Sequence, residues 1–134
     1  MPISDAWLKA TLKQATHRSV LRQIVTADEM LSAPGFVQVL TEDASFRFGG
    51  APPTVGKAAI ENQVTSFFST VRTLRHDIEL AWEQPELLAY EARVTYTLPN
   101  GQTLSLPYAN ILRLRGALID DYRIYIDPAA LIQG

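Results

Sequence analysis

The chain has 134 residues, of which 47% are hydrophobic and 19% charged, and its net charge is −2. This size and balance are typical of one soluble globular domain spanning residues 1–134. The sequence has no basic stripe, so nucleic acid is not an expected partner. The absence of cysteine excludes disulfides, thiolate nucleophiles and cysteine-based zinc sites.

The N-terminal segment predicts helices. Residues 4–30 carry apolar residues at helical spacing, with Ser4 as a cap and a break near residues 17–19. Charged residues are interspersed throughout residues 1–28, unlike a signal peptide or a membrane span, so we expect a cytoplasmic protein without membrane contact. After the interruption at Pro34-Gly35, residues 36–40 predict a short second helical piece.

The rest of the chain predicts one further helix and then strands. Residues 44–48 suggest a short strand, residues 49–53 a loop, and residues 56–71 an amphipathic helix. Long β-rich runs follow over residues 73–82, 87–98, 103–114 and 118–126, and Asn100-Gly101 predicts a two-residue hairpin turn. This order predicts an α+β fold with a curved, wholly antiparallel sheet over the helices.

The expected turns align the strands. The two-residue turn, together with a four-residue loop over residues 83–86, would place His76, Arg93 and Tyr108 in one row, with Glu91 opposite Asn110. That face is apolar with polar groups set into it, so we expect it to form a cavity under the helices. The other face is smooth and apolar, and we expect it to form a homodimer interface. Its residues are Tyr90, Ala92, Val94, Tyr96, Pro107, Ala109 and Ile111.

Three motifs accompany this order of elements: Leu-Thr-Glu-Asp-Ala-Ser-Phe over residues 40–46, Pro-Pro-Thr-Val-Gly-Lys-Ala-Ala-Ile over residues 52–60, and Tyr-Arg-Ile-Tyr-Ile-Asp-Pro over residues 122–128. With them the chain resembles the nuclear transport factor 2-like superfamily over nearly its whole length, particularly the SnoaL-like, polyketide cyclase-like branch. The resemblance implies a cone in which N-terminal helices pack in the concave face of a curved antiparallel sheet. It implies no single function, because the superfamily includes cyclases, isomerases, epoxide hydrolases, dehydratases and binding modules.

Residues 42–56 are also similar to limonene epoxide hydrolase, without its catalytic residues. The tyrosine and asparagine with which that family positions water fall on Phe46 and Phe48. Its Asp–Arg–Asp set falls on Thr95, Arg93 and Ile124, so only the arginine is retained. The aspartate of ketosteroid isomerase-like proteins also falls near Phe48. The carboxylates that would serve as acid and base in those families are therefore missing.

His76 is the strongest catalytic candidate, because imidazole titrates near neutral pH and can carry protons. The alternative is a structural histidine bonded to a neighbouring strand. Arg93 could hold a substrate oxygen or pair with Glu91, and Glu91 could act as a base or stay ionised in that pair. Asp127 is the nearest match to the aspartate of SnoaL-like cyclases, but Asp127-Pro128 also fits a helix N-cap.

The remaining candidates would shape the binding site. Tyr108, Asn110 and Tyr122 could donate hydrogen bonds to a ligand carbonyl, or simply pack in the wall. Phe46, Phe48 and Ile124 are expected as apolar wall. The two histidines show no metal-ligand spacing, so neither metal nor cofactor is expected.

Two functions remain open. The first is a domain that binds a small hydrophobic molecule in a mostly apolar pocket and has possible proton-transfer chemistry. The alternative is a cofactor-free isomerase, cyclase or dehydratase acting on a small hydrophobic carbonyl compound.

Overall fold

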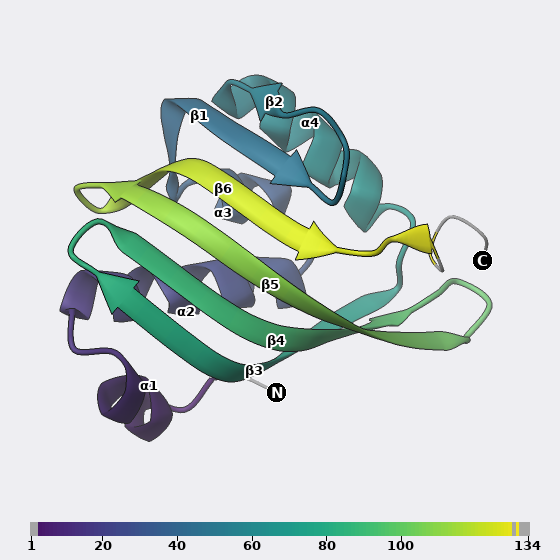
Figure 1. Cartoon of the computed structure of the whole chain (residues 1–134). Coiled ribbons are helices and arrows are strands. Elements are labelled where there is room, and N and C mark those ends of the chain that lie inside the picture. Colours follow the sequence, from purple (N-terminus) through teal and green to yellow (C-terminus); the bar gives the residue numbers. More distant parts are fainter. Residues whose placement is uncertain (1–2, 130, 132–134) are drawn as a thin grey trace.

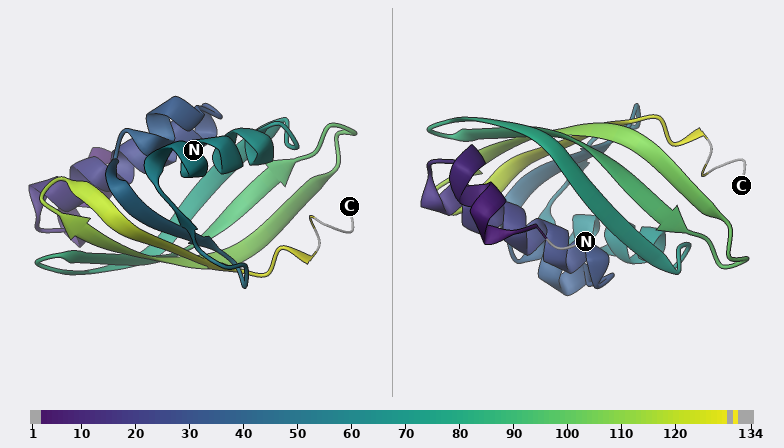
Figure 2. Two further views of the ribbon diagram at one scale, coloured as in Figure 1. Left: turned by 90° about the horizontal axis from the view of Figure 1, so that it is seen from above. Right: turned by 90° about the horizontal axis from the view of Figure 1, so that it is seen from below.

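The computed structural model describes residues 3–129 and Leu131. Its elements are α1 (Asp5–Thr11), α2 (Ala15–Glu29), α3 (Ala33–Val37), β1 (Leu40–Phe48), β2 (Thr54–Val55), α4 (Lys57–Phe68), β3 (Thr73–Gln84), β4 (Leu87–Thr97), β5 (Thr103–Arg115) and β6 (Leu118–Ile126). Figures 1 and 2 show a curved sheet with the helices gathered on one side. The α+β architecture is therefore confirmed. None of the helices in the described part of the chain has the length and apolar composition that a bilayer crossing needs.

The sheet has six strands in the order β2-β1-β6-β5-β4-β3. Strands β3 to β6 form the expected antiparallel meander. The expectation of a wholly antiparallel sheet is wrong at one pair, because β1 runs parallel to β6. These two strands are far apart in the chain, so no hairpin turn determines their relative direction.

The N-terminal helices differ from expectation in their boundaries. The break falls at residues 12–14 instead of 17–19. Pro34 and Gly35 lie inside α3, which Ser32 caps by accepting the Gly35 N–H at 3.1 Å. The following residues join β1 from Leu40 onward instead of extending the helix.

The break before α2 is stabilised from another element. Gln14, at the N-cap position, makes no side-chain cap bond. The Glu83 carboxylate on β3 instead accepts the backbone N–H groups of Lys13 and Gln14, and it lies 2.9 Å from Nδ1 of the buried His17. Burial by itself raises the pKa of Glu83, but the hydrogen bonds from Lys13, His17 and Gln14 outweigh it, and the net effect is a lowered pKa. Glu83 thus caps α2 from the neighbouring strand.

The β4–β5 hairpin is one residue longer than expected. Leu98 and Gln102 pair across a three-residue loop, with the Leu98 N–H donating to the Gln102 carbonyl at 2.8 Å. Gly101 takes the positive φ of 88° that such a loop requires. Arg93 therefore pairs with Pro107, and Ala92 pairs with Tyr108.

The β3–β4 hairpin is shorter than expected, because Gln84 pairs with Leu87 across the two residues Pro85-Glu86. A β-bulge between Ile78 and Leu80 shifts the register, and His76 pairs with Val94 instead of Arg93. Since a one-residue shift exchanges the two faces of a strand, β4 turns over relative to the prediction.

The face expected to form a homodimer interface is therefore divided. Tyr90, Val94 and Tyr96 are at most 4% exposed and belong to the core of the chain itself. Glu91 and Arg93 are exposed on the outer face instead. This register is the more stable one, because it buries aromatic and β-branched side chains and leaves the charged side chains in water. The β5 members of that face, Pro107, Ala109 and Ile111, are not buried and stay on the outside of the sheet, so a homodimer through the outer face remains a prediction without the β4 residues.

Neighbouring positions on β4 test this register. Val94→Glu should lower the free energy of unfolding by about 3–5 kcal/mol, because an unpaired charge would enter the core. Arg93→Glu should change it by less than about 0.5 kcal/mol, because that position faces water. Urea denaturation followed by circular dichroism measures both variants. Equal effects at the two positions would contradict the register.

A second test concerns the cap of α2. Glu83→Ala should lower the unfolding free energy at pH 7 by about 0.5–2 kcal/mol, the usual value of a helix cap. Because folding lowers the pKa of Glu83, its stabilisation is complete above its ordinary pKa of 4.5 and is lost as the pH falls through the lower folded-state pKa. The difference between wild type and variant should therefore shrink on acidification.

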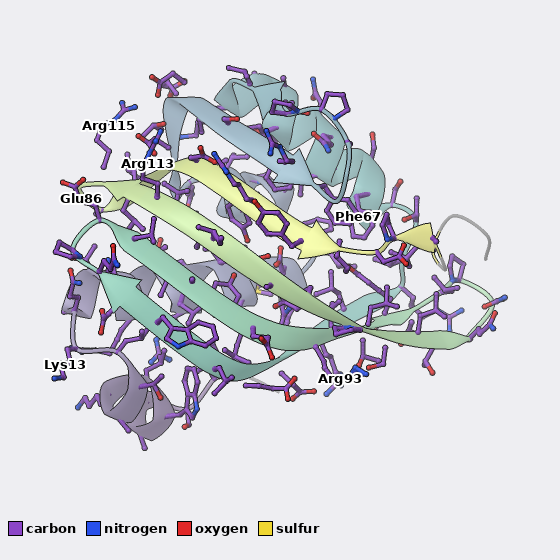
Figure 3. The ribbon with its side chains drawn as sticks, viewed as in Figure 1. Lys13, Phe67, Glu86, Arg93, Arg113 and Arg115 are labelled. Atoms are coloured by element: carbon purple, nitrogen blue, oxygen red, sulfur yellow. The ribbon has the colours of Figure 1, made fainter. Side chains whose placement is uncertain are left out.

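The matched control for the cap is Glu86→Ala, in the adjacent turn at an exposed position (Figure 3). It should leave the unfolding free energy within about 0.5 kcal/mol of wild type at both pH values. A difference for Glu83→Ala that stays constant between pH 7 and pH 3 would count against the carboxylate as the cap.

Candidate functional site

A cavity of about 230 Å³ lies between the helices and the concave face of the sheet. Its wall is mainly aromatic and aliphatic. Phe67 of α4, labelled in Figure 3, lies 5.7 Å from Phe48 of β1 and 5.6 Å from Tyr96 of β4, measured between ring centroids. The lining residues are Asp28, Phe36, Phe46, Phe48, Gln63, Val64, Phe67, Phe68, Leu74, His76, Val94, Tyr96, Tyr108, Asn110, Tyr122, Ile124 and Ile126.

Three polar side chains from three elements form a hydrogen-bonded chain in this wall. Nε2 of His76 on β3 lies 2.9 Å from Oδ2 of Asp28 on α2. Nδ1 of the same ring lies 2.7 Å from the hydroxyl of Tyr108 on β5. The His76 backbone N–H donates to the Glu29 carboxylate at 2.8 Å, which holds the strand against the helix. All three members of the chain are at most 9% exposed.

Burial determines where the Tyr108 proton lies. Burial strongly raises the pKa of Tyr108, and the negative charge of Asp28 adds to this effect, so the hydroxyl keeps its proton. With a neutral imidazole, the Nε2–H donates to Asp28 and Nδ1 accepts from Tyr108. When the ring carries protons on both nitrogens, the Nδ1–H donates to the Tyr108 oxygen. The Tyr108 O–H can then donate to a different acceptor. The arrangement can therefore pass a proton between the two ends of the chain.

A second polar group surrounds Asn110 on β5. Its Nδ2 donates to the Tyr90 hydroxyl at 2.7 Å, and the Tyr122 hydroxyl lies 3.5 Å away. Its Oδ1 is buried and has no hydrogen-bond partner among the residues that the structure describes. Burial raises the pKa of Tyr90 and of Tyr122, so both phenols stay neutral.

Most of the predicted site residues meet at this cavity. They are Phe46, Phe48, His76, Tyr108, Asn110, Tyr122 and Ile124. The placement of Glu91 and Arg93 in the cavity is wrong, because the turned β4 leaves both exposed on the outer face. Asp127 is also exposed and lies outside the cavity wall. Its Oδ1 accepts the Ala129 N–H at 3.1 Å, the arrangement of a helix cap.

Sequence reasoning missed Asp28, the acidic partner of His76. A signal for it was present, because Asp28 follows Leu21, Ile24 and Val25 at helical spacing and so lies on the apolar stripe of α2. An acidic residue at a core-facing position usually has a buried partner. Tyr96 was also missed, because the expected register placed it on the outer face.

No group of three or more histidine, aspartate or glutamate side chains in the described part of the chain could hold a metal ion. The two histidines are engaged with different carboxylates, His17 with Glu83 and His76 with Asp28.

Comparison with known proteins places this geometry in a family. The model of the SnoaL-like domain matches residues 22–122, most of the chain. The chain belongs to the SnoaL-like domain family. No curated protein matches its sequence.

Solved structures share the fold of this SnoaL-like chain at low sequence identity. A SnoaL-like polyketide cyclase from Jannaschia sp. CCS1 superposes with a TM-score of 0.77 at 13% identity, covering 90% of this chain and 91% of that one. TerC, co-crystallised with polyporic acid, gives 0.75 at 13%, covering 89% and 97%. An epoxide hydrolase from M. tuberculosis, of the type related to limonene epoxide hydrolase, gives 0.75 at 10%, covering 91% and 90%. These likenesses establish the cone-shaped fold.

Proposed function

We propose that this SnoaL-like domain binds a small, mainly apolar carbonyl compound in its cavity and moves a proton on it without a cofactor. The observation that carries the proposal is the hydrogen-bonded chain Asp28–His76–Tyr108 in an otherwise apolar wall. A few convergent polar groups in an apolar pocket are typical of a ligand site. The volume of about 230 Å³ lies below the range of roughly 300–1,000 Å³ that suits drug-sized ligands, so the ligand is small.

The two ends of the chain have different chemical capacities. Tyr108 keeps its proton and can donate it toward a ligand carbonyl, where negative charge develops during enolisation. Asp28 uses Oδ2 for His76, and no hydrogen bond to its Oδ1 is found among the described residues. That oxygen can accept the proton from the carbon next to the carbonyl.

His76 connects these two events. In the imidazolium form, its Nδ1 proton replaces the one that Tyr108 gives to the ligand oxygen, while the Asp28 carboxylate takes the carbon-bound proton. The products are an enol, a neutral imidazole and a protonated Asp28, so protons and charge balance. Return of the proton to a different carbon would complete an isomerisation. The apolar wall supports this step, because exclusion of water strengthens hydrogen bonds to the developing charge.

A non-catalytic binding module is the second candidate, and one observation favours it. Both ring nitrogens of His76 are already engaged, so the imidazole has no free nitrogen for direct contact with a ligand. The family resemblance adds to this reading, since Phe46, Phe48 and Ile124 stand where related enzymes carry polar catalytic residues. In this case the cavity would hold a ligand, and the buried polar chain would only stabilise the fold.

Exchange of carbon-bound protons separates the two candidates. With acetophenone as the probe in D₂O at pH 7, the wild type should accelerate exchange of the methyl protons over buffer alone, as followed by proton NMR. His76→Gln keeps much of the side-chain shape but cannot transfer protons near neutral pH. It should lower the enzymatic exchange rate by about 10²–10⁴-fold, the usual contribution of a positioned acid or base.

The control for this experiment is His17→Gln, which alters the other buried histidine, at the Glu83 cap and outside the cavity wall. Once folding is verified by circular dichroism, this variant should exchange at the wild-type rate. Saturable binding of acetophenone without exchange above buffer would contradict proton transfer and favour the binding module. An unchanged rate in His76→Gln would remove this histidine from the mechanism.

A further inference from the structure

Asn110 has an unpartnered polar atom in the cavity wall. The side chain is 3% exposed, its Nδ2 is held by the Tyr90 hydroxyl, and its Oδ1 has no partner among the described residues. A buried carbonyl oxygen without a donor destabilises the fold, so buried polar atoms in native proteins are nearly always satisfied. Because Asn110 also lines the cavity, a bound molecule is well placed to supply the missing donor.

We propose that Asn110 binds a hydroxyl group of the ligand, so that the substrate class is a hydroxy-carbonyl compound instead of a simple ketone. This inference rests on the proposed function and deepens it. The ligand hydroxyl would donate to Oδ1 of Asn110, while its carbonyl accepts from Tyr108.

The surroundings of Asn110 favour a neutral donor. Tyr90 and Tyr122 beside it remain uncharged, so neither phenol offers a negative partner to a cation. A positively charged amine would be drawn to the carboxylate of Asp28 in the same cavity. A ligand hydroxyl supplies the single neutral donor that Oδ1 lacks.

The spacing along β5 restricts the ligand further. Tyr108 and Asn110 are two residues apart, so their side chains leave the same face of the strand at Cα positions about 6.6 Å apart. One compact molecule can therefore reach both groups. An aromatic ketone with a hydroxyl on the ring, such as 3-hydroxyacetophenone, has this arrangement of oxygens on a flat apolar frame.

A matched pair of probes tests the inference. Dissociation constants of acetophenone and 3-hydroxyacetophenone are measured by isothermal titration calorimetry. Wild type should bind the hydroxylated compound about 3- to 10-fold more tightly, as expected for one hydrogen bond between neutral groups. Asn110→Leu, which has nearly the same shape, should bind both compounds within about twofold of each other, because the acceptor is gone.

The control is Asn62→Leu, the same substitution at an exposed position of α4 outside the cavity wall. It should keep the wild-type preference. Three outcomes would each overturn the inference. Wild type could bind both compounds equally, the preference could persist in Asn110→Leu, or neither probe could show saturable binding. The wild-type comparison decides the question alone if Asn110→Leu fails to fold.

Failure of this inference is distinguishable from failure of proton transfer. His76→Gln should lower the exchange rate by about 10²–10⁴-fold but leave the preference for the hydroxyl intact. If wild type exchanges the protons of acetophenone but does not prefer 3-hydroxyacetophenone, only the role of Asn110 is contradicted.

Discussion

Covering one face of a curved sheet is the constraint on which the rest of the structure depends. The helices lie on one side only (Figure 2), so every side chain of β3 to β6 is either under them or in water. The face with Tyr90, Val94 and Tyr96 goes inside because it buries the most apolar surface. The same sorting carries His76 and Asn110 into an apolar interior, where each polar atom needs a partner.

Helix α2 supplies some of these partners. The same contacts hold the helix against the sheet and build the wall of the cavity. Its N-terminus is capped by Glu83 of β3. Near its C-terminus, Asp28 bonds the His76 ring and Glu29 bonds the His76 backbone, also on β3. The helix is thus held to one strand at both ends, which fixes the carboxylate of Asp28 at the cavity. The proposed proton transfer would need its acid and base held in fixed positions, and these contacts hold Asp28 and His76 against each other.

The cavity holds two polar groups that differ in how completely they are satisfied. The chain through His76 has both ring nitrogens bonded. The group around Asn110 leaves one buried acceptor, Oδ1, without a hydrogen-bond partner among the described residues. In the cavity wall, the short first strand β1 contributes the apolar Phe46 and Phe48, and the hydrogen-bonded titratable residues Asp28, His76 and Tyr108 come from α2, β3 and β5.

The sequence by itself determined most of the elements and their order, because apolar periodicity, capping residues and turn residues act within a few positions of each other. It did not predict the two-residue strand β2, which is too short to show a pattern. It did not determine the hairpin lengths, since Asn100-Gly101 suits both two- and three-residue loops and one residue reverses a strand. His76 and Tyr108 still share a face, because the two register errors on either side of β4 compensate. Only the tertiary structure decided that Glu91 and Arg93 face water, that β1 runs parallel to β6, and that Asp28 meets His76. These outcomes depend on burial and contacts between distant segments, which no local pattern contains.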